Sequence, residues 1–250
     1  MLAHRIIPVI LYRGHQVVKG KRFDSWRSIG HVRQSMRIYQ ARDVDEVVLL
    51  GVGATPAGSD PDFALMRDLL GDCFFPVTVG GGIQTLEHFR LALQNGADKI
   101  AINTSAIERP ALIREAAEKF GRQAVVVSID VRLGRVHGRC GKEETDLHPV
   151  AWAEAAEALG AGEIIINDVD RDGMLAGYNL PLIEEISNAV SIPVVACGGA
   201  GSYEDFAKAL DVGAHAVAAG AMFAFSDQTP AGAADYLASR GYCVRRKIAA

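Results

Sequence analysis

Short apolar runs recur along the whole chain, and amphipathic helical patterns separate several of them. Runs this continuous are typical of strands buried on both faces of a parallel sheet. Eight are present, at RIIPVIL (5–11), DEVVLLGVG (45–53), PVTVGGGI (76–83), DKIAIN (98–103), AVVVSID (124–130), EIIIND (163–168), IPVVACGG (192–199) and AVAAGAMF (216–223). The clearest helical patterns are LEHFRLALQNG (86–96), PALIREAAEKFG (110–121), PVAWAEAAEALG (149–160) and YEDFAKALDVG (203–213). This alternation predicts a parallel β/α architecture, either a closed barrel or a doubly wound open sheet.

An internal repeat favours the barrel. The segment FPVTVGGGIQTLEHFRLALQNGADKIAIN (75–103) matches IPVVACGGAGSYEDFAKALDVGAHAVAAG (192–220) at a constant offset of 117 residues. Pairs at this offset are Pro76–Pro193, Gly81–Gly198, Gly82–Gly199, Phe89–Phe206, Gly96–Gly213, Ala97–Ala214 and Glu46–Glu163. Two similar halves of about four strands each are naturally accommodated by a closed (β/α)8 barrel. We therefore expect one TIM-barrel domain over residues 1–250.

Composition narrows the functional classes. The chain has 250 residues, of which 49% are hydrophobic, and this length and composition suit one large domain. Its formal net charge of −4 gives little support to nucleic-acid binding. Four cysteines without a CxxC pair fit free thiols in a reducing compartment. The apolar stretch at the N-terminus is too short and too charged for a secretory signal. No apolar run in the sequence is long enough to span a membrane. We expect a cytoplasmic protein.

Two glycine clusters follow predicted strands, where backbone N–H groups can approach an anion and a following helix N-terminus adds positive potential. Each cluster is followed one strand later by small or amide-bearing residues. The candidate phosphate contacts are Gly81, Gly82, Asn103 and Thr104 on one side of the barrel, and Gly198, Gly199, Gly201, Ala219 and Gly220 on the other. Such a pair of sites suits a long substrate with a phosphate at each end. The alternative is that these glycines only form tight turns.

Asp130 ends the apolar run AVVVSID, which directs its carboxylate toward the catalytic face of a barrel. Partial burial would raise its pKa and suit it to acid–base work, although a structural loop cap is the alternative. Lys19 lies beyond the first strand and could hold a phosphate or a developing anion; an exposed structural lysine is the alternative. The acidic stretch from Asn167 to Tyr178 offers Asp172 and Gly173 for a phosphate or hydroxyl contact.

No metal or cofactor site is expected. The seven histidines show no HxH or HxxxH pairing. The stretch beginning at Asp168 imitates the start of an EF-hand, but loop position 12 is Asn179 rather than the required glutamate. Cys197 has no adjacent base in the sequence, so a packing role is favoured over a nucleophile. Trp26 and Trp152 are most simply packing residues.

Motifs along nearly the whole chain resemble the cyclase subunit of imidazole glycerol phosphate synthase. They are RIIP, VVKG, DE, VGGGI, GADKI, AVVVSID, GAGEI, DRDG, GY and CGGAG, in order. The resemblance implies a (β/α)8 barrel that receives ammonia from a glutaminase docked at its floor. Members use this ammonia to cleave a bis-phosphorylated ribonucleotide and close an imidazole ring in histidine biosynthesis.

The resemblance also assigns roles to residues. It places an ammonia gate of charged residues at Arg5, Glu46, Lys99 and Glu163, and a glutaminase contact at Asp98. Buried charges of this kind are costly unless they pair with one another, so an ion-pair layer closing the floor is an alternative that is compatible with a gate. The family's phosphate contacts match Gly82, Asn103, Thr104, Asp172, Gly173, Gly199, Ala219 and Gly220, where the family more often has Ser at 220. One of its two catalytic aspartates matches Asp130.

Two departures matter for function. The second catalytic aspartate of the family falls on Leu11, and an acid common at the end of the second strand falls on Gly51. Losing one partner of an acid–base pair typically costs about 10²–10⁴-fold in rate. A subset of the family that is similar to this chain in PVIL, CFFPVTVGGGI and ACGGAG also has an apolar residue at position 11. That subset is associated with glutamine-dependent conversion of sugar acetamido groups to amidino groups, although Gly51 departs from it too.

Three interpretations follow. The chain is an ammonia-channelling paralogue that serves a sugar amidation, a genuine histidine-pathway cyclase, or a silent conduit that activates a glutaminase. The partner implied is a glutaminase, and the substrate is a phosphorylated or sugar small molecule. Residues 13–31 and 132–149 are expected as mouth loops, and they contain no motif that names the acceptor.

Overall fold

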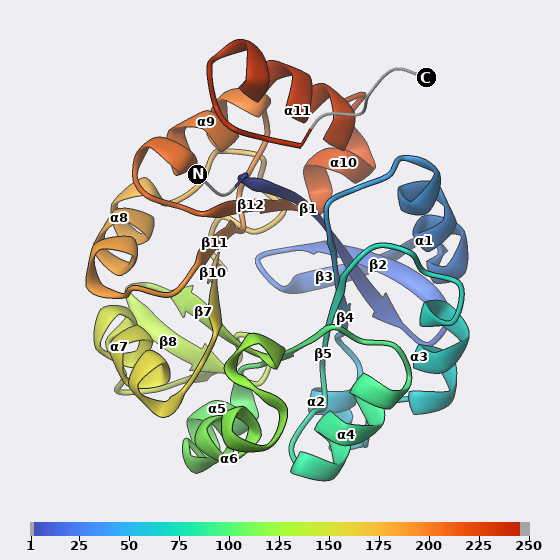
Figure 1. Ribbon diagram of the computed structural model, residues 1–250, viewed down its shortest axis with the longest axis vertical. Coiled ribbons are helices and arrows are strands. Elements are labelled where there is room, and N and C mark those ends of the chain that lie inside the picture. Colours follow the sequence, from blue (N-terminus) through green and yellow to red (C-terminus); the bar gives the residue numbers. More distant parts are fainter. Residues whose placement is uncertain (1–2, 246–250) are drawn as a thin grey trace.

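A computed structural model describes residues 3–245, and its strands form a closed parallel barrel (Figure 1). The barrel strands are β1 (Arg5–Arg13), β4 (Val47–Gly51), β5 (Val77–Gly80), β6 (Lys99–Ile102), β7 (Val125–Arg132), β10 (Glu163–Asp168), β11 (Val194–Cys197) and β12 (Ala216–Ala219). β1 pairs in parallel with both β4 and β12, which closes the ring. All eight predicted strands are present, so the barrel prediction is confirmed and the open sheet is excluded.

The barrel strands are buried on both faces, as their continuous apolar sequences require. Inward-facing side chains, among them Ile7, Val9 and Val48, form a core along the barrel axis. Outward-facing side chains pack against the surrounding helices in two further clusters. The sequence pattern therefore determines both the closed ring and its helical coat.

The helices surround the barrel (Figure 1). They are α1 (Val32–Ala41), α2 (Ala54–Ala57), α3 (Phe63–Leu70), α4 (Leu86–Gln94), α5 (Thr104–Glu108), α6 (Ala111–Phe120), α7 (Pro149–Leu159), α8 (Leu180–Ala189), α9 (Tyr203–Asp211), α10 (Ala221–Phe225) and α11 (Pro230–Ser239), with a 3₁₀ turn, η1 (Arg122–Ala124).

The internal repeat is visible in the packing and the caps of two helices. Phe89 on α4 and Phe206 on α9 are both fully buried. Thr85 caps α4 by accepting a hydrogen bond from the His88 amide, and Ser202 caps α9 with a complete capping box. A buried phenylalanine and a hydroxyl-bearing N-cap residue therefore recur at the 117-residue offset and fix the equivalent helix in each half.

The mouth loops expected at residues 13–31 and 132–149 are built as two hairpins, and residues from both line the cavity described below. Residues 13–31 contain β2 (Gln16–Lys21) and β3 (Asp24–His31), which pair in antiparallel fashion beside β1. Residues 132–149 contain β8 (Arg135–Gly138) and β9 (Glu143–Glu144), which extend β7. β3 is largely exposed and lacks apolar alternation, so periodicity could not reveal it.

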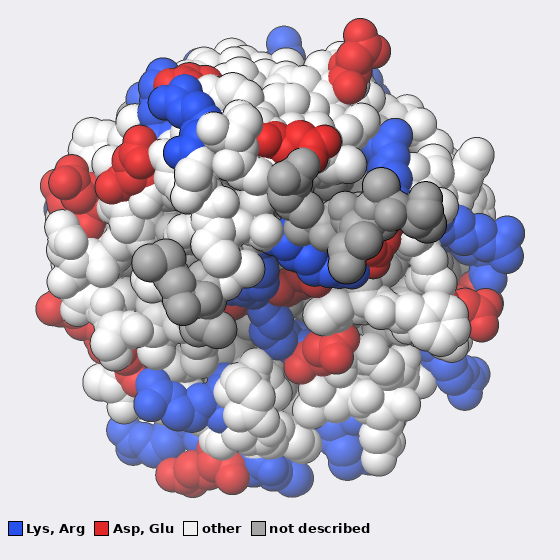
Figure 2. Space-filling view, turned by 45° about the horizontal axis from the view of Figure 1, so that its top comes forward, with Lys and Arg blue, Asp and Glu red and all other residues white. Residues whose placement is uncertain are grey.

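The surface in Figure 2 carries basic and acidic side chains interspersed, and both kinds gather in a central hollow. This face therefore does not present a broad field of one sign. Within residues 3–245, no helix has the length and apolar character needed to cross a membrane.

Candidate active site

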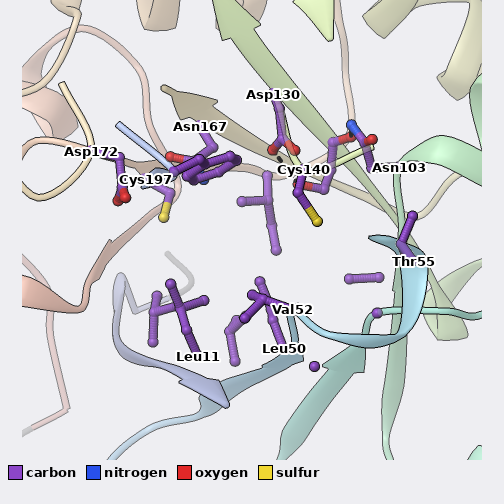
Figure 3. Close-up of a pocket in the computed structure, with 18 of the residues that line it drawn as sticks. Leu11, Leu50, Val52, Thr55, Asn103, Asp130, Cys140, Asn167, Asp172 and Cys197 are labelled. Atoms are coloured by element: carbon purple, nitrogen blue, oxygen red, sulfur yellow. Dashed lines mark hydrogen bonds between the residues drawn. The ribbon is translucent and has the colours of Figure 1, made fainter. Parts of the chain in front are cut away.

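A cavity of about 360 Å³ opens at the carboxyl ends of the barrel strands. Strand register defines its inner layer: Asp130 on β7 lies beside Asn167 on β10, and Asn167 lies beside Cys197 on β11. Across the barrel, Leu11 on β1 lies beside Leu50 on β4. Figure 3 shows the two groups on opposite sides of the pocket. The cavity is therefore polar on one wall and apolar on the other.

Asp130 is the acid of the polar wall and is only 7% exposed. Burial raises the pKa of Asp130 from 3.8 to about 7, with a smaller raising effect from Asp172 and an opposing hydrogen bond from Ser128. The Ser128 hydroxyl lies 3.2 Å from Oδ1 of Asp130. A carboxyl group with a pKa near neutrality can both give and take a proton, which is the property that acid–base catalysis requires.

Lys19 comes from β2 and turns back into the cavity. It is 6% exposed, so the exposed-lysine alternative is wrong. Its Nζ donates a hydrogen bond to the Val9 carbonyl at 2.9 Å, and burial lowers the pKa of Lys19 to about 8. Burial also raises the pKa of Asp172 to about 6, while the Lys19 charge opposes that rise. A Cβ on Gly220 would lie 2.3 Å from the Lys19 Nζ, so a side chain at this position would require the end of Lys19 to move.

The cavity is lined by Gly81, Gly82, Gly198 and Gly199 of the two glycine clusters, together with Gly173, Ala219 and Gly220, whereas Gly201 is not among its lining residues. Gly81 has a φ of +97°, and a Cβ there would lie 2.0 Å from the Gly51 carbonyl oxygen. Gly199 has a φ of +118°, and a Cβ there would lie 2.3 Å from the Gly177 carbonyl oxygen. Sharp turns alone therefore require these glycines. Their role in binding phosphate stays a proposal, supported by their place on opposite sides of the cavity.

Asn103 and Thr104 line the cavity, but their side chains already have partners. Nδ2 of Asn103 donates to the carbonyl oxygens of Ser128 and His137, each at 3.1 Å. Oγ1 of Thr104 accepts a hydrogen bond from the Arg139 amide at 2.9 Å. The two residues thus attach the end of β6 to β7 and to its hairpin.

At the opposite end of the barrel, four charged side chains form a closed ring. Arg5 bridges Glu46 and Glu163, and Lys99 lies 2.8 Å from Glu46 and 2.9 Å from Glu163. The buried Thr78 hydroxyl donates to Glu46 at 2.6 Å. Although burial opposes it, attraction to Lys99 and Arg5 lowers the pKa of Glu46. The predicted pairing among these charges is confirmed, and each charge has a partner of opposite sign.

Asp98 lies outside this ring, directly before Lys99, and is exposed. Its Oδ2 accepts a hydrogen bond from the Val77 amide at 2.8 Å, which links the starts of β5 and β6. Within the described part of the chain, no group of three or more His, Cys, Asp or Glu side chains is arranged to hold a metal ion.

Sequence reasoning missed several residues of the cavity. Trp26 lines it from the β2–β3 hairpin, so packing alone does not describe this residue, whereas Trp152 is buried. Cys197 lines the cavity and also packs against the barrel core, as its expected packing role requires, and burial raises the pKa of its thiol to about 12, which argues against a nucleophile. Asn167 and Leu50 were missed because only strand register places them beside Asp130 and Leu11.

A match to a family model identifies the family of this chain. Residues 5–229 match the model described as "Histidine biosynthesis protein". The chain belongs to that family. It is 40% identical to the imidazole glycerol phosphate synthase subunit HisF of Thermobifida fusca, covering 98% of this chain and 99% of that protein. It is also 40% identical to the putative subunit hisF2 of Campylobacter jejuni, with 98% and 99% coverage, and 39% identical to that of Pseudomonas aeruginosa, with 90% and 92% coverage.

Members of the histidine biosynthesis protein family thus include relatives described as HisF and others described as hisF2, at nearly the same identity to this chain. The chain is HisF-like over its described barrel. Overall sequence identity does not distinguish the HisF relatives from the hisF2 relatives. The residues of the cavity must therefore be used to choose between them. Leu11 at the apolar wall is the feature that bears most directly on the reaction.

Proposed function

We propose that this chain is the ammonia-using subunit of a cytoplasmic glutamine amidotransferase, with a glutaminase docked at the barrel floor. Ammonia would enter through the ring of Arg5, Glu46, Lys99 and Glu163 and reach the cavity at the other end. The acceptor would be a sugar bearing an acetamido group. The observation that carries this choice is Leu11, which lies beside Leu50 on the wall opposite Asp130.

The barrel interior supports an ammonia route. Above the ring, the axis is lined by apolar side chains that include the small residues Ala101, Ala216 and Ala218. A neutral molecule crosses such a layer far more readily than an ion, because desolvating a charge costs much more. The route therefore suits ammonia and excludes ammonium.

The cavity supports amidation of a carbonyl acceptor. Ammonia would add to the acetamido carbon, the carbonyl oxygen would leave as water, and an amidino group would result. The departing water takes one proton from the added ammonia and the second from Asp130, whose pKa of about 7 leaves it partly protonated at neutral pH. The protonated amidino product can return a proton to Asp130. Lys19 would hold an anionic part of the substrate beside Asp172.

The histidine-pathway cyclase reaction is the second candidate. Asp130, Lys19 and the glycine clusters lie together in one cavity, and several relatives are described as subunits of imidazole glycerol phosphate synthase. Against it, the apolar side chain of Leu11 cannot transfer a proton. A reaction that needs one acid at position 130 and another at position 11 has only Asp130 here.

One experiment separates the candidates. Purified protein receives ammonium salt with either the histidine-pathway bis-phosphorylated ribonucleotide or a set of nucleotide-linked acetamido sugars, and products are resolved by mass spectrometry. We expect exchange of one oxygen for NH in an acetamido sugar and no imidazole glycerol phosphate. Cyclase turnover at the rate of a HisF control would refute the proposal. Stimulation of a glutaminase without any product from either substrate would instead identify a silent conduit.

A further inference from the structure

The two halves of the barrel fix their floors with equivalent contacts but with different side chains. Asp98, just before β6, accepts a hydrogen bond from the Val77 amide at the start of β5. At the repeat offset of 117 residues, His215 stands just before β12, and its Nδ1 lies 3.3 Å from the Val194 amide nitrogen at the start of β11. An imidazole changes its charge between about pH 5 and pH 8. The second half therefore uses a side chain that titrates near neutral pH where the first half uses a carboxylate.

The hydrogen bond at His215 defines the protonation state of its ring. A backbone amide can only donate, so Nδ1 must be unprotonated to accept, and the proton of the neutral imidazole lies on Nε2. Val194 is fully buried. Protonation of Nδ1 removes the acceptor and leaves the amide of a buried residue without this partner, which is unfavourable. The backbone hydrogen bond from the His215 amide to the Val194 carbonyl, at 2.8 Å, does not depend on the ring and remains.

This contact lies beside one ion pair of the charge ring. In the barrel, β11 and β12 lie between β10 and β1, so the bridge from Arg5 on β1 to Glu163 on β10 spans them. Arg5 pairs in register with Ala216, which follows His215. Val194 pairs in register with the residue that follows Glu163. The His215 ring therefore joins the two strands that separate the partners of this bridge.

The groups around His215 oppose its protonation on balance. Among the described residues, His4 and Arg5 act on it from the start of β1, and Glu163 acts on it from the start of β10. The start of β11, at residues 192–194, contributes only apolar side chains. Burial lowers the pKa of His215 below its ordinary value of 6.5, His4 and Arg5 lower it further, and Glu163 opposes them. The neutral ring is therefore favoured at neutral pH, and a proton gained at acid pH places a positive charge beside Arg5 and Glu163.

We propose that His215 is a pH-sensitive contact of the barrel floor. Its neutral ring joins the starts of β11 and β12, and its protonation releases the Val194 amide, repels Arg5 and competes for Glu163. Acid pH thereby loosens the junction between the two strands and weakens the bridge that spans them. Since the folded state binds this proton less tightly than the unfolded chain, the contribution of His215 to stability is fully present above about pH 6.5 and is lost as the pH falls below that value.

The consequence for activity rests on the proposed function, in which ammonia enters through the ring. A weakened bridge between Arg5 and Glu163 disturbs that entrance at acid pH. Between pH 7.5 and pH 6, glutamine-driven amidation should therefore fall more in the wild type than in His215→Asn. Amidation driven by ammonium salt should fall equally in the two proteins, because that ammonia does not have to pass the floor.

The first test compares stability at two pH values in the chain without a partner. His215→Asn keeps a side-chain acceptor for the Val194 amide but cannot gain a proton. From pH 7.5 to pH 5, the melting temperature of this variant relative to the wild type should rise by about 2 °C, the shift expected for one hydrogen bond in a chain of this length. His15→Asn is the matched control, since His15 is exposed at the mouth end of the barrel. No rise for His215→Asn, or an equal rise for the control, would overturn the proposal.

The second test follows the Cε1 proton of His215 by NMR as the pH is changed. His4→Asn removes a neighbouring positive charge, so the titration midpoint of His215 should move to higher pH. Glu163→Gln removes an attracting carboxylate, so the midpoint should move to lower pH. Circular dichroism establishes folding, and His4→Asn decides the matter if Glu163→Gln does not fold, because it leaves the charge ring intact. A midpoint that stays in place in every folded variant would refute the coupling of His215 to its charged neighbours.

The two tests need neither a glutaminase nor an acceptor, so they separate this role of His215 from the proposed function. The expected shifts in a protein that amidates no acetamido sugar would leave the pH-sensitive contact standing and remove only the reaction. Amidation by a protein in which both tests fail would keep the reaction and remove the contact.

Discussion

Tyr12 on β1 lies over Gly51 on β4, so that a Cβ atom on Gly51 would be 3.2 Å from the Tyr12 ring. Tyr12 is 7% exposed and belongs to the core outside the barrel. The aromatic side chain at position 12 and the missing side chain at position 51 are therefore one coupled feature. A side chain at position 51, an acid included, would require the Tyr12 ring to shift.

This coupling can be measured with a double-mutant cycle. Gly51→Ala should lower the free energy of unfolding by about 1 kcal/mol, because the new methyl group crowds the Tyr12 ring. The same substitution in a Tyr12→Val background should cost less, since the ring is gone. Denaturant unfolding of the four proteins gives the coupling energy. Additive effects would show that the two positions are independent.

Asp130 should make stability depend on pH. Its pKa is about 7 in the folded protein against 3.8 as the ordinary value, so the folded state binds this proton more tightly than the unfolded chain. Its contribution to stability is therefore greatest below about pH 4 and declines by roughly 4 kcal/mol as the pH rises through 7.

Asp130→Asn removes this decline, since the amide does not titrate. The variant should gain thermal stability over the wild type at pH 8 and lose most of that gain at pH 4. Thermal unfolding across this range checks the prediction, with Asp227→Asn as an exposed control. A gain that does not change with pH would contradict a raised pKa for Asp130.

Loss of one carboxylate from the charge ring at the barrel floor should lower both stability and glutamine-driven activity. Glu46→Gln leaves Arg5 and Lys99 each with one carboxylate fewer, and breaking a buried pair from one side typically costs about 3 kcal/mol. Under the proposed function, glutamine-driven amidation should fall more than ammonium-driven amidation, because only the glutamine-derived ammonia would pass through the floor. Glu87→Gln breaks the exposed pair with Arg90 and serves as the control. Equal loss in both assays would argue against passage through the ring.

Gly199 should tolerate no side chain. Gly199→Ala combines a left-handed backbone with a contact 2.3 Å from the Gly177 carbonyl, and should cost at least about 2 kcal/mol in unfolding free energy. Gly58→Ala also has a positive φ, of +62° in the left-handed helical region, but open space around the new methyl group, and should cost about 1 kcal/mol. Chemical denaturation compares them. Equal costs would show that backbone strain alone, not crowding, makes Gly199 necessary.

Under the proposed function, in which a glutaminase docks at the barrel floor, Phe74 should contribute to that contact. It is 91% exposed, lies just before β5 on the floor side, and donates its amide hydrogen to Gln40. Phe74→Ser should weaken glutaminase binding about tenfold while changing stability by less than about 0.5 kcal/mol. Leu133→Ser is the matched control, because Leu133 is 82% exposed at the mouth. Binding is measured by titration calorimetry, and equal effects of the two substitutions would exclude a specific role for Phe74.

Much of the fold is encoded locally and could be predicted. Continuous apolar runs reveal buried strands, and the offset that pairs Glu46 with Glu163 anticipates two halves of one ring. The β2–β3 hairpin could not be predicted, since its second strand is exposed and has no periodicity. Asn167 was overlooked for a different reason: its importance depends on its register against Asp130, which is a property of two distant segments brought together.

The ring of charges at the barrel floor has a consequence for the protonation state in which nitrogen would reach the cavity. Its four charges alternate in sign and cancel, and attraction within the ring lowers the pKa of Glu46 while the pKa of Arg5 is raised. The ring itself therefore keeps a constant, neutral charge as the cell's pH varies. Under the proposed route, an ammonium ion must leave its proton behind before it enters. Each nitrogen then arrives at Asp130 as a free base, and the proton needed to expel oxygen must come from the cavity itself.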